Sequence, residues 1–362
     1  MPRILLALCL FAVIPVSAQP VADMPRVFIS EAAAIPQTDD QHPVRIKQNP
    51  ADGSLYVLAT SGRLYRLDPN GTGGFDSLEV LGQGDHNTVG PIGMTFAADG
   101  TLYLLGNENV GSAQTRFVLR KGSVTAGTAW STVASSEAYL LSHTWFDHKA
   151  NGLALSPDES TLYINSGART DHGESYGGVR EEGLTAIVLK IPATAVDLVL
   201  PNDREALRDG GYIFAEGIRN SFDLEFSPAG DLMAADNSGD RDDAEELNWI
   251  REGRHYGFPW RIGISDTPMQ HAGYDPSVDP FVQPDRNTDN IADTGWYFSD
   301  DPAYPAPPAG LVFTDPIPNQ GPFADQFRMP GTGDITDASQ SSTTVGSFTP
   351  HRSPLGLVFD SD

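Results

Sequence analysis

The stretch from Val44 to Val57, VRIKQNPADGSLYV, decides how we expect this chain to fold. Two short runs of alternating apolar and polar residues flank a Pro-Ala-Asp-Gly turn. Alternation is typical of strands with one buried face, and Asp-Gly is typical of a hairpin between them. Closely similar hairpins are found later in the chain, as PIGMTFAADGTLYL (91–104), GLALSPDESTLYI (152–164) and FDLEFSPAGDLMA (222–234).

This repeat predicts an all-β propeller. The leucines that begin each second run are 47, 60 and 70 residues apart: Leu55, Leu102, Leu162 and Leu232. Such spacing suits one four-stranded antiparallel blade per repeat, with loops of variable length. We expect the four leucines at equivalent places in successive blades. An all-β sandwich with similar hairpins is the alternative.

A fifth copy begins at Pro354, as PLGLVFDSD, and the sequence stops at its turn. Because a closed ring is what protects the sheet edges of a propeller, we expect an incomplete, open ring in a fragment of the fold. Residues 265–346 interrupt the rhythm with many Pro, Asp and Gly. We interpret them as a long loop excursion within one propeller domain, residues 19–362, and not as a second domain.

The first residues have the features of an export signal. Arg3 precedes an apolar run from Leu5 to Val16, and small residues follow up to Ala18. This pattern predicts a signal peptide over residues 1–18 and a secreted or periplasmic protein, with a buried strand as the alternative. The one cysteine, Cys9, lies inside the segment, so the mature chain would form no disulfide.

The chain is strongly acidic, with 48 Asp and Glu against 23 Lys and Arg and a formal charge of −25. Such a surface repels nucleic acids and anionic membranes, and the mature part has no apolar run long enough to span a bilayer. It suits calcium, which prefers carboxylate and carbonyl oxygens. The sequence has no Cys-x-x-Cys-His motif for haem attachment, so any electron acceptor would be a separate molecule.

Three stretches lie outside the repeat and carry candidate chemistry. In the first, Asp147-His148 precedes an inner strand, where a neighbouring carboxylate could orient a histidine base. In the second, Arg219 could polarise a substrate oxygen or hold an anion. In the third, Asp236 to Pro259, six carboxylates lie within eleven residues, which favours a cation such as calcium. A surface histidine, a structural ion pair and a solvated acidic loop are the respective alternatives.

The order of these stretches resembles the glucose/sorbosone dehydrogenases. The resemblance rests on Gly217-Ile218-Arg219-Asn220, on EELNWIREGRHYGFP (245–259), and on FTPHRSPLGL (348–357). It covers the chain from about Val44 to its last residue. It implies a six-bladed propeller that uses pyrroloquinoline quinone (PQQ) and calcium to oxidise a hydroxyl of an aldose or a related polyol.

The resemblance also implies roles for individual residues. His148 would remove the hydroxyl proton as hydride passes to the quinone, and Asp147 would orient it. Arg219 would contact both the quinone and the substrate as a catalytic residue, and Asn220 and Asn237 would contact the quinone. The carbonyls of Ser238 and Gly239 would hold calcium. The glutamine that faces the cofactor in the family is replaced by Thr88, and the family's other quinone-binding cations would lie beyond Asp362.

A second calcium site is predicted from Asp285 to Asp293, where oxygen-bearing side chains alternate: Asp285, Asn287, Asp289 and Asp293. An ordinary Asx-rich turn is the alternative. For the whole chain we therefore expect an exported, PQQ- and calcium-dependent sugar oxidoreductase. The competing expectation is a non-catalytic propeller that binds carbohydrate or protein, and a calcium-dependent lactonase-like hydrolase is a weaker third.

Overall fold

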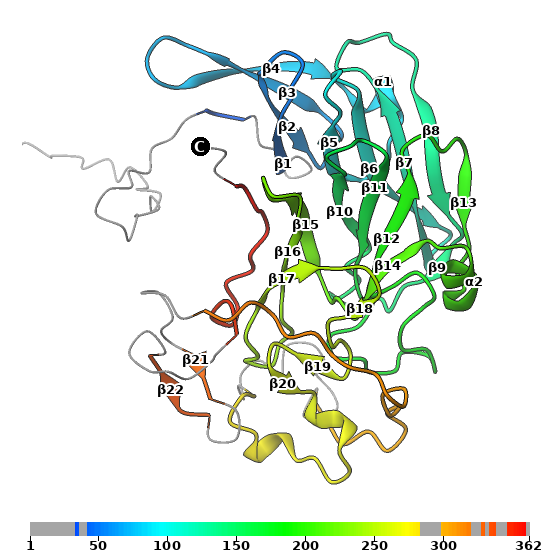
Figure 1. The fold of residues 1–362 in the computed structure, drawn as a ribbon, viewed down its shortest axis with the longest axis vertical. Coiled ribbons are helices and arrows are strands. Elements are labelled where there is room, and N and C mark those ends of the chain that lie inside the picture. Colours follow the sequence, from blue (N-terminus) through cyan, green and yellow to red (C-terminus); the bar gives the residue numbers. More distant parts are fainter. Residues whose placement is uncertain are drawn as a thin grey trace, which may run out of the picture.

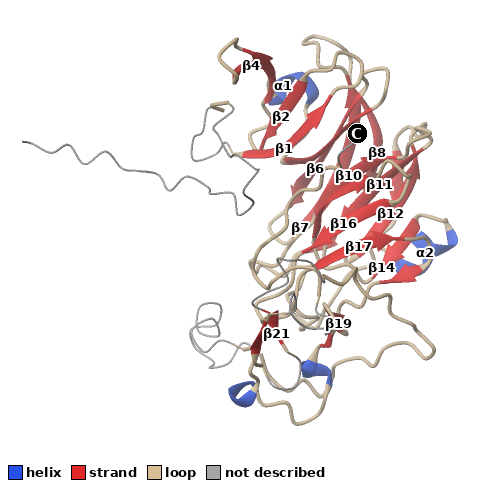
Figure 2. Cartoon of the chain, turned by 60° about the vertical axis from the view of Figure 1, so that its left-hand side comes forward, coloured by secondary structure: helices blue, strands red, loops and turns tan. Residues whose placement is uncertain are grey.

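Each of the four hairpin repeats forms the first two strands of its own sheet. The structure is a computed structural model that describes residues 33–35, 42–282, 298–319, 327–329, 333–337 and 346–359. The predicted signal peptide and the residues from Asp285 to Asp293 lie outside these ranges. Nearly all of the regular structure is strand, with two short α-helices at Gln83–His86 (α1) and Arg204–Asp209 (α2) (Figure 2).

The four sheets are antiparallel blades with the inner strand first. The first contains β1 (Pro43–Gln48), β2 (Leu55–Ala59), β3 (Leu64–Pro69) and β4 (Phe75–Leu81). The second contains β5 (Pro91–Phe96), β6 (Leu102–Val110), β7 (Gln114–Gly122) and β8 (Ser131–Ser136), with β9 (Tyr139–Leu140) paired to β7 and β13 (Leu198–Leu200) added beside β8.

The third blade contains β10 (Ala150–Leu155), β11 (Thr161–Ser166), β12 (Ile187–Pro192) and β14 (Ile213–Glu216), with β18 (Arg254–His255) added in parallel. The fourth contains β15 (Ser221–Phe226), β16 (Leu232–Asp236) and β17 (Glu246–Ile250). The sheets follow one another in an arc (Figure 1), with inner strands β1, β5, β10 and β15 in consecutive contact. The prediction of an all-β propeller with an open ring is confirmed, and four of the expected six blades are present among the described residues.

The four leucines of the repeat occupy equivalent places, as predicted. Each pairs with the last residue of its inner strand, in the registers Gln48↔Leu55, Phe96↔Leu102, Leu155↔Leu162 and Phe226↔Leu232. The turns between the strands need a residue with positive φ. Gly53, Gly100 and Gly230 supply it without steric cost, and Glu159 takes it in the third hairpin at φ 59°.

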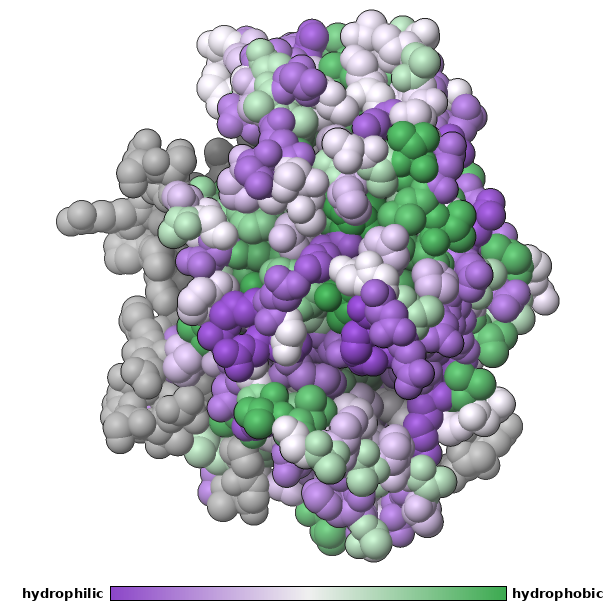
Figure 3. All heavy atoms as spheres, turned by 45° about the vertical axis from the view of Figure 1, so that its right-hand side comes forward, coloured by the Kyte–Doolittle hydropathy of each residue, from purple (hydrophilic) through white to green (hydrophobic). Residues whose placement is uncertain are grey.

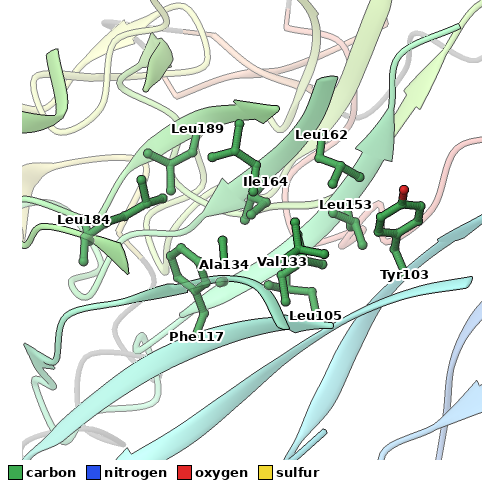
Figure 4. Packing of buried hydrophobic residues seen from close by; sticks show 14 of the residues in the cluster. Tyr103, Leu105, Phe117, Val133, Ala134, Leu153, Leu162, Ile164, Leu184 and Leu189 are labelled. Carbon is green, nitrogen blue, oxygen red and sulfur yellow. The ribbon is translucent and has the colours of Figure 1, made fainter. Parts of the chain in front are cut away.

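The core lies between neighbouring blades. The largest cluster joins the second and third blades, where Leu105, Phe117 and Val133 pack with Leu153 and Ile164 (Figure 4). Smaller clusters join the first blade to the second and the third to the fourth. Burial of these apolar side chains contributes about 25 cal/mol per Å² removed from water, so the packed blades hold the frame that positions the loops. Figure 3 shows that hydrophilic residues cover much of one outer face, with smaller hydrophobic patches between them.

Side chains link the first blade to the fourth, although their strands form no common sheet. The guanidinium of Arg45, on β1, donates to the carbonyls of Asn151 and Phe222 and lies 3.8 Å from the carboxylate of Asp223. The ammonium of Lys47 lies 3.4 Å from the same carboxylate. These contacts join β1 to the inner strands β10 and β15 of the third and fourth blades.

The stretch predicted as a loop excursion contains little regular structure in its described parts. It begins in the hairpin of β19 (Arg261–Ile262) and β20 (Ser265–Asp266). It continues with 3₁₀ turns at Pro268–Gln270 (η1) and Pro276–Val278 (η2) and the two-residue strands β21 (Phe327–Arg328) and β22 (Ile335–Thr336). Its Met269, Val282 and Phe298 pack around Phe146, so the excursion borders the loop that carries His148. Its status as part of a single domain stays a prediction.

The C-terminal segment lies against the acidic stretch. Phe348 forms a β-bridge with Glu245, and the carboxylate of Glu245 accepts the backbone N–H groups of Arg352 and Ser353, both at 3.0 Å. Residues 354–359, the described part of the fifth repeat, form no strand. Within the described residues, no helix is both long and apolar enough to cross a membrane.

Candidate functional site

The candidate residues lie where inner strands begin and second strands end. Because each first hairpin is antiparallel, the start of β10 pairs with the end of β11, and the start of β15 with the end of β16. His148 precedes β10, Arg219 precedes β15, and Asn237 follows β16. The topology therefore brings three loops from the third and fourth blades to the same face of the propeller.

His148 is held by the backbone of the neighbouring strand end. Its N–H donates to the carbonyl of Ala168 at 3.0 Å, and its ring Nδ1 lies 3.0 Å from the same oxygen. A carbonyl oxygen only accepts, so Nδ1 carries the hydrogen and Nε2 is left as the acceptor of the ring. The side chain is half-buried, with its ring centre 6.5 Å from that of Phe146.

The surroundings keep this ring neutral. Burial and the nearby guanidinium of Arg219 lower the pKa of His148 to about 3, against smaller opposing effects of Ala168 and Asp171. An imidazole with that pKa is unprotonated at neutral pH. The geometry thus provides a proton acceptor at Nε2.

Asp147 does not orient the histidine in this structure. Its carboxylate accepts the backbone N–H groups of Ser142 at 2.7 Å and His143 at 2.9 Å, which closes the loop from Ser142 to Asp147. The sequence predicts this carboxylate on the ring. The carbonyl of Ala168 takes that place, because the ring turns toward the end of β11 and away from its own loop.

Arg219 is a buried residue whose guanidinium is surrounded by oxygen. Nε donates to the Asp171 carbonyl at 2.8 Å, and Nη2 donates to the Asp171 carboxylate at 2.8 Å. Nη1 donates to the carbonyls of Asn237 at 3.2 Å and Ser238 at 2.8 Å. Four of its five N–H groups are thus directed at this chain. The ion pair that the sequence left open as an alternative is present, with Asp171 as the partner.

The carboxylate of Asp171 also contacts a histidine. The ring of His172 lies 3.0 Å from its other carboxylate oxygen. Burial by itself would lower the pKa of His172, but Glu174 and Asp171 outweigh it and raise that pKa. Burial would raise the pKa of Asp171, and His172 and Arg219 outweigh it and lower that pKa. The buried Asp171 carboxylate, paired with Arg219 and in contact with His172, forms the ionic centre of the site, and removal of a partner would leave its charge less compensated.

A chain of amide side chains connects the third blade to the fourth. Asn165 donates to Asn151 at 2.7 Å, and Asn151 donates to Asn220 at 2.8 Å. Asn220 donates to Asn237 at 3.2 Å, and Asn237 donates to the carbonyl of Pro354 at 3.1 Å. Each amide donor thus meets the oxygen of the next residue, which fixes the orientation of the series.

The loop after β16 provides the carbonyls that were expected to bind calcium. The carbonyl of Ser238 accepts from Arg219, as described above. Gly239 packs so tightly on Asp171 that a Cβ atom there would lie 2.6 Å from the carboxylate, which explains the need for glycine. The donor set is therefore of the kind calcium prefers, but Arg219 already fills it.

The acidic stretch is explained by partners within the chain. Asp236 accepts the backbone N–H groups of Arg219 and Asn220, while Arg241 pairs with Asp243. Asp242 pairs with His351. Glu245 and Glu246 accept backbone N–H groups. In the described ranges, no three His, Cys, Asp or Glu side chains are grouped so that they could hold a metal ion. Calcium binding by this stretch therefore stays a prediction.

Thr88 precedes the inner strand β5 of the second blade. Its side chain is fully buried, and its methyl group packs beside Gly106, where a Cβ would approach within 2.7 Å. Its backbone N–H donates to His86 at 3.0 Å. A cofactor contact of Thr88 stays a prediction. The predicted calcium residues Asp285, Asn287, Asp289 and Asp293 lie outside the described residues.

The model of the glucose/sorbosone dehydrogenases matches residues 40–306. The chain belongs to this family. None of the curated proteins compared matches it.

Solved structures similar to the chain include sugar dehydrogenases of low identity. The apo aldose sugar dehydrogenase from Escherichia coli is 17% identical, with 62% of this chain and 64% of that one covered and a TM-score of 0.44. The PQQ-bound aldose sugar dehydrogenase from Streptomyces coelicolor is 20% identical, with coverages of 61% and 66% and a TM-score of 0.38. The PQQ domain of the Coprinopsis cinerea pyranose dehydrogenase is 13% identical, with coverages of 65% and 56% and a TM-score of 0.45. The chain thus spans less than two thirds of the length of these proteins.

Sequence reasoning missed Asp171 and the amide chain. Asp171 stands in ARTDHGES (168–175), outside the repeat, and its neighbours His172 and Glu174 were a signal of buried charge. Asn151 and Asn165 flank the third hairpin repeat and had no predicted role. Polar side chains in otherwise apolar strands, such as LYINS (162–166), were the available sign that these strands end in a polar site.

Proposed function

We propose that this glucose/sorbosone dehydrogenase family member oxidises a hydroxyl group of an aldose or a related polyol. The observation that carries the proposal is His148, whose Nδ1 is engaged by Ala168 and whose Nε2 is an unprotonated acceptor. Removal of a hydroxyl proton needs a base of this kind close to the reacting carbon. We extend the proposal to export of the mature chain and to a separate electron acceptor.

The loop before His148 supports a sugar substrate. Phe146 points inward, while Trp145 is 87% exposed. Hydroxyl and backbone contacts within the loop fix its shape, since Thr144 N–H donates to Ser142 and Phe146 N–H donates to Thr144. An indole face held outward offers the apolar C–H face of a pyranose ring a stacking surface. We assign Trp145 as a substrate-positioning residue.

The cofactor supported by the family is PQQ, and calcium is the metal that the resemblance implies. In this arrangement the residues that the resemblance assigns to these groups are engaged within the chain. Arg219, Asn220 and Asn237 direct their donors to other parts of the chain, and the Ser238 carbonyl accepts from Arg219. We therefore assign to this chain only the base and the ionic centre behind it.

A second candidate is a sugar-binding propeller without turnover. The observation that favours it is the same engagement of Arg219, Asn220 and Asn237, which leaves the expected quinone contacts satisfied without a cofactor. Under this alternative the exposed Trp145 still binds sugar, and His148 is a structural residue.

The test is an assay of the purified chain with PQQ, CaCl₂, an artificial electron acceptor and a panel of aldoses. Oxidation by the wild type that falls at least about 100-fold in His148→Gln supports the dehydrogenase, since general-base catalysis typically contributes about 10²–10⁴-fold. His143→Gln is the matched control, because that histidine is exposed on the same loop. Sugar binding by calorimetry with no PQQ-dependent turnover would establish the binding protein instead.

A further inference from the structure

The guanidinium of Arg219 donates only to oxygen atoms, which form a cage around its N–H groups, and the Phe146 ring centre lies 5.6 Å from its central carbon. Two of the oxygens belong to Asp171, which follows the third blade's second strand, and two are the carbonyls of Asn237 and Ser238 from the fourth blade. All four donor–acceptor distances lie between 2.8 and 3.2 Å. Arg219 is 3% exposed and Asp171 is 0% exposed, so solvent does not screen the charge.

Such a cage has the chemistry of a calcium site, with one carboxylate and several carbonyls. Calcium takes six to eight oxygens at about 2.3–2.6 Å, and it would need the Ser238 carbonyl that Arg219 now occupies. A divalent ion at that oxygen would also stand within a few ångströms of the guanidinium. In a buried position, repulsion between two such charges is severe.

We infer that the Arg219 guanidinium is itself the cation of this site, so that calcium and the Arg219 side chain exclude each other at the Ser238 carbonyl. The wild-type chain then binds no calcium in the cage. Removal of the guanidinium would leave the Asp171 carboxylate and the carbonyls of Asn237 and Ser238 facing one space, which a calcium ion can enter. The inference concerns charge and stability, and it holds whether or not the chain oxidises sugars.

Arg169 provides a matched control within the same region. It is also 3% exposed, and its guanidinium donates to four backbone carbonyls, those of Leu140, Leu141, Val179 and Arg180. All four hydrogen-bond acceptors of the Arg169 guanidinium are backbone carbonyls, and none is a carboxylate. Loss of Arg169 therefore removes a similar number of hydrogen bonds, but it leaves no anionic cage behind.

The experiment measures melting temperature and calcium binding for the wild type, Arg219→Ala and Arg169→Ala, in CaCl₂ and in EDTA. We expect the wild type to melt at the same temperature in both. Both variants should melt lower in EDTA, and only Arg219→Ala should regain several degrees in millimolar calcium, because a ligand that binds only the folded state stabilises it by mass action. A folded Arg219→Ala that does not respond to calcium would overturn the inference.

A calcium titration of the wild type and of Asp171→Asn decides the matter even where Arg219→Ala does not fold. The absence of binding by the wild type below about 1 mM supports the inference, and so does binding that Asp171→Asn leaves unchanged, because such a site lies elsewhere. One-to-one binding to the wild type that Asp171→Asn abolishes would contradict it.

Discussion

The side-chain amide of Asn151 lies 2.8 Å from the amide oxygen of Asn220, and this contact joins the third blade to the fourth. Asn151 lies on β10 and is 1% exposed, while Asn220 immediately precedes β15. The same Asn151 side chain accepts from Asn165 at 2.7 Å. One residue thus fixes the spacing of two inner strands on the side where His148 and Arg219 lie.

We expect Asn151→Asp to destabilise the protein by about 2–3 kcal/mol. The substitution keeps the acceptor for Asn165 but replaces the donor to Asn220 with a second oxygen, so that two acceptors meet in a buried place. The free energy of unfolding in urea measures this. The control is Asn70→Asp, because Asn70 is exposed and uses its oxygen to accept the N–H groups of Thr72 and Gly74. Equal losses for the two variants would show that the amide contact does not join the blades.

The fold could be predicted from the sequence because its signal is local. Alternation and a turn residue with positive φ are properties of a single hairpin, so Leu102 and Leu232 could be placed in register without knowledge of any other blade. The strands added to the second and third blades, β13 and β18, could not be predicted in this way. Each pairs with a strand that is distant in sequence, and a strand of two or three residues is too short to show an alternating pattern.

The site could be predicted only in part, because residue type and sequence position do not determine which partner a charged side chain meets. His148 and Arg219 were found from their positions before inner strands. Their partners, Ala168 and Asp171, lie in the loop after β11. Which residues of that loop contact His148 and Arg219 depends on how the loop folds back. The carboxylates of Asp236 and Glu245 looked like metal ligands, yet they accept backbone N–H groups.

We expect Trp145→Ala to raise the KM for an aldose about tenfold while kcat changes little. The indole is 87% exposed, so its removal costs little packing within the protein. A contact made equally in the bound substrate and in the transition state affects binding and not the rate of the chemical step. Initial rates over a range of sugar concentrations separate the two parameters. The control is Trp249→Ala, on β17, which removes an indole that is 43% exposed.

The wild type should also lose part of its tryptophan fluorescence when sugar binds, and Trp145→Ala should not. This second measurement does not depend on turnover. A Trp145→Ala variant with unchanged KM and an unchanged fluorescence response would contradict the role of this side chain in sugar binding.

The imidazole of His148 should remain neutral through the ordinary pH range. Burial and Arg219 lower its pKa to about 3, so the folded state should take up its proton only in strong acid. An unfolded chain binds that proton near pH 6.5. The unfolded state therefore holds more protons between these values, and His148 contributes stability that is fully present above about pH 6.5 and is lost progressively as the pH falls toward 3.

The NMR signal of the His148 ring, assigned by its loss in His148→Gln, should not shift between pH 8 and pH 5. Arg219→Lys retains the positive charge and is expected to leave the pKa low, whereas Arg219→Met removes one of the two causes and should raise it. A ring that titrates near pH 6.5 in the wild type would show that neither burial nor Arg219 acts on it, and the proton acceptor of the proposed reaction would then be protonated in mild acid.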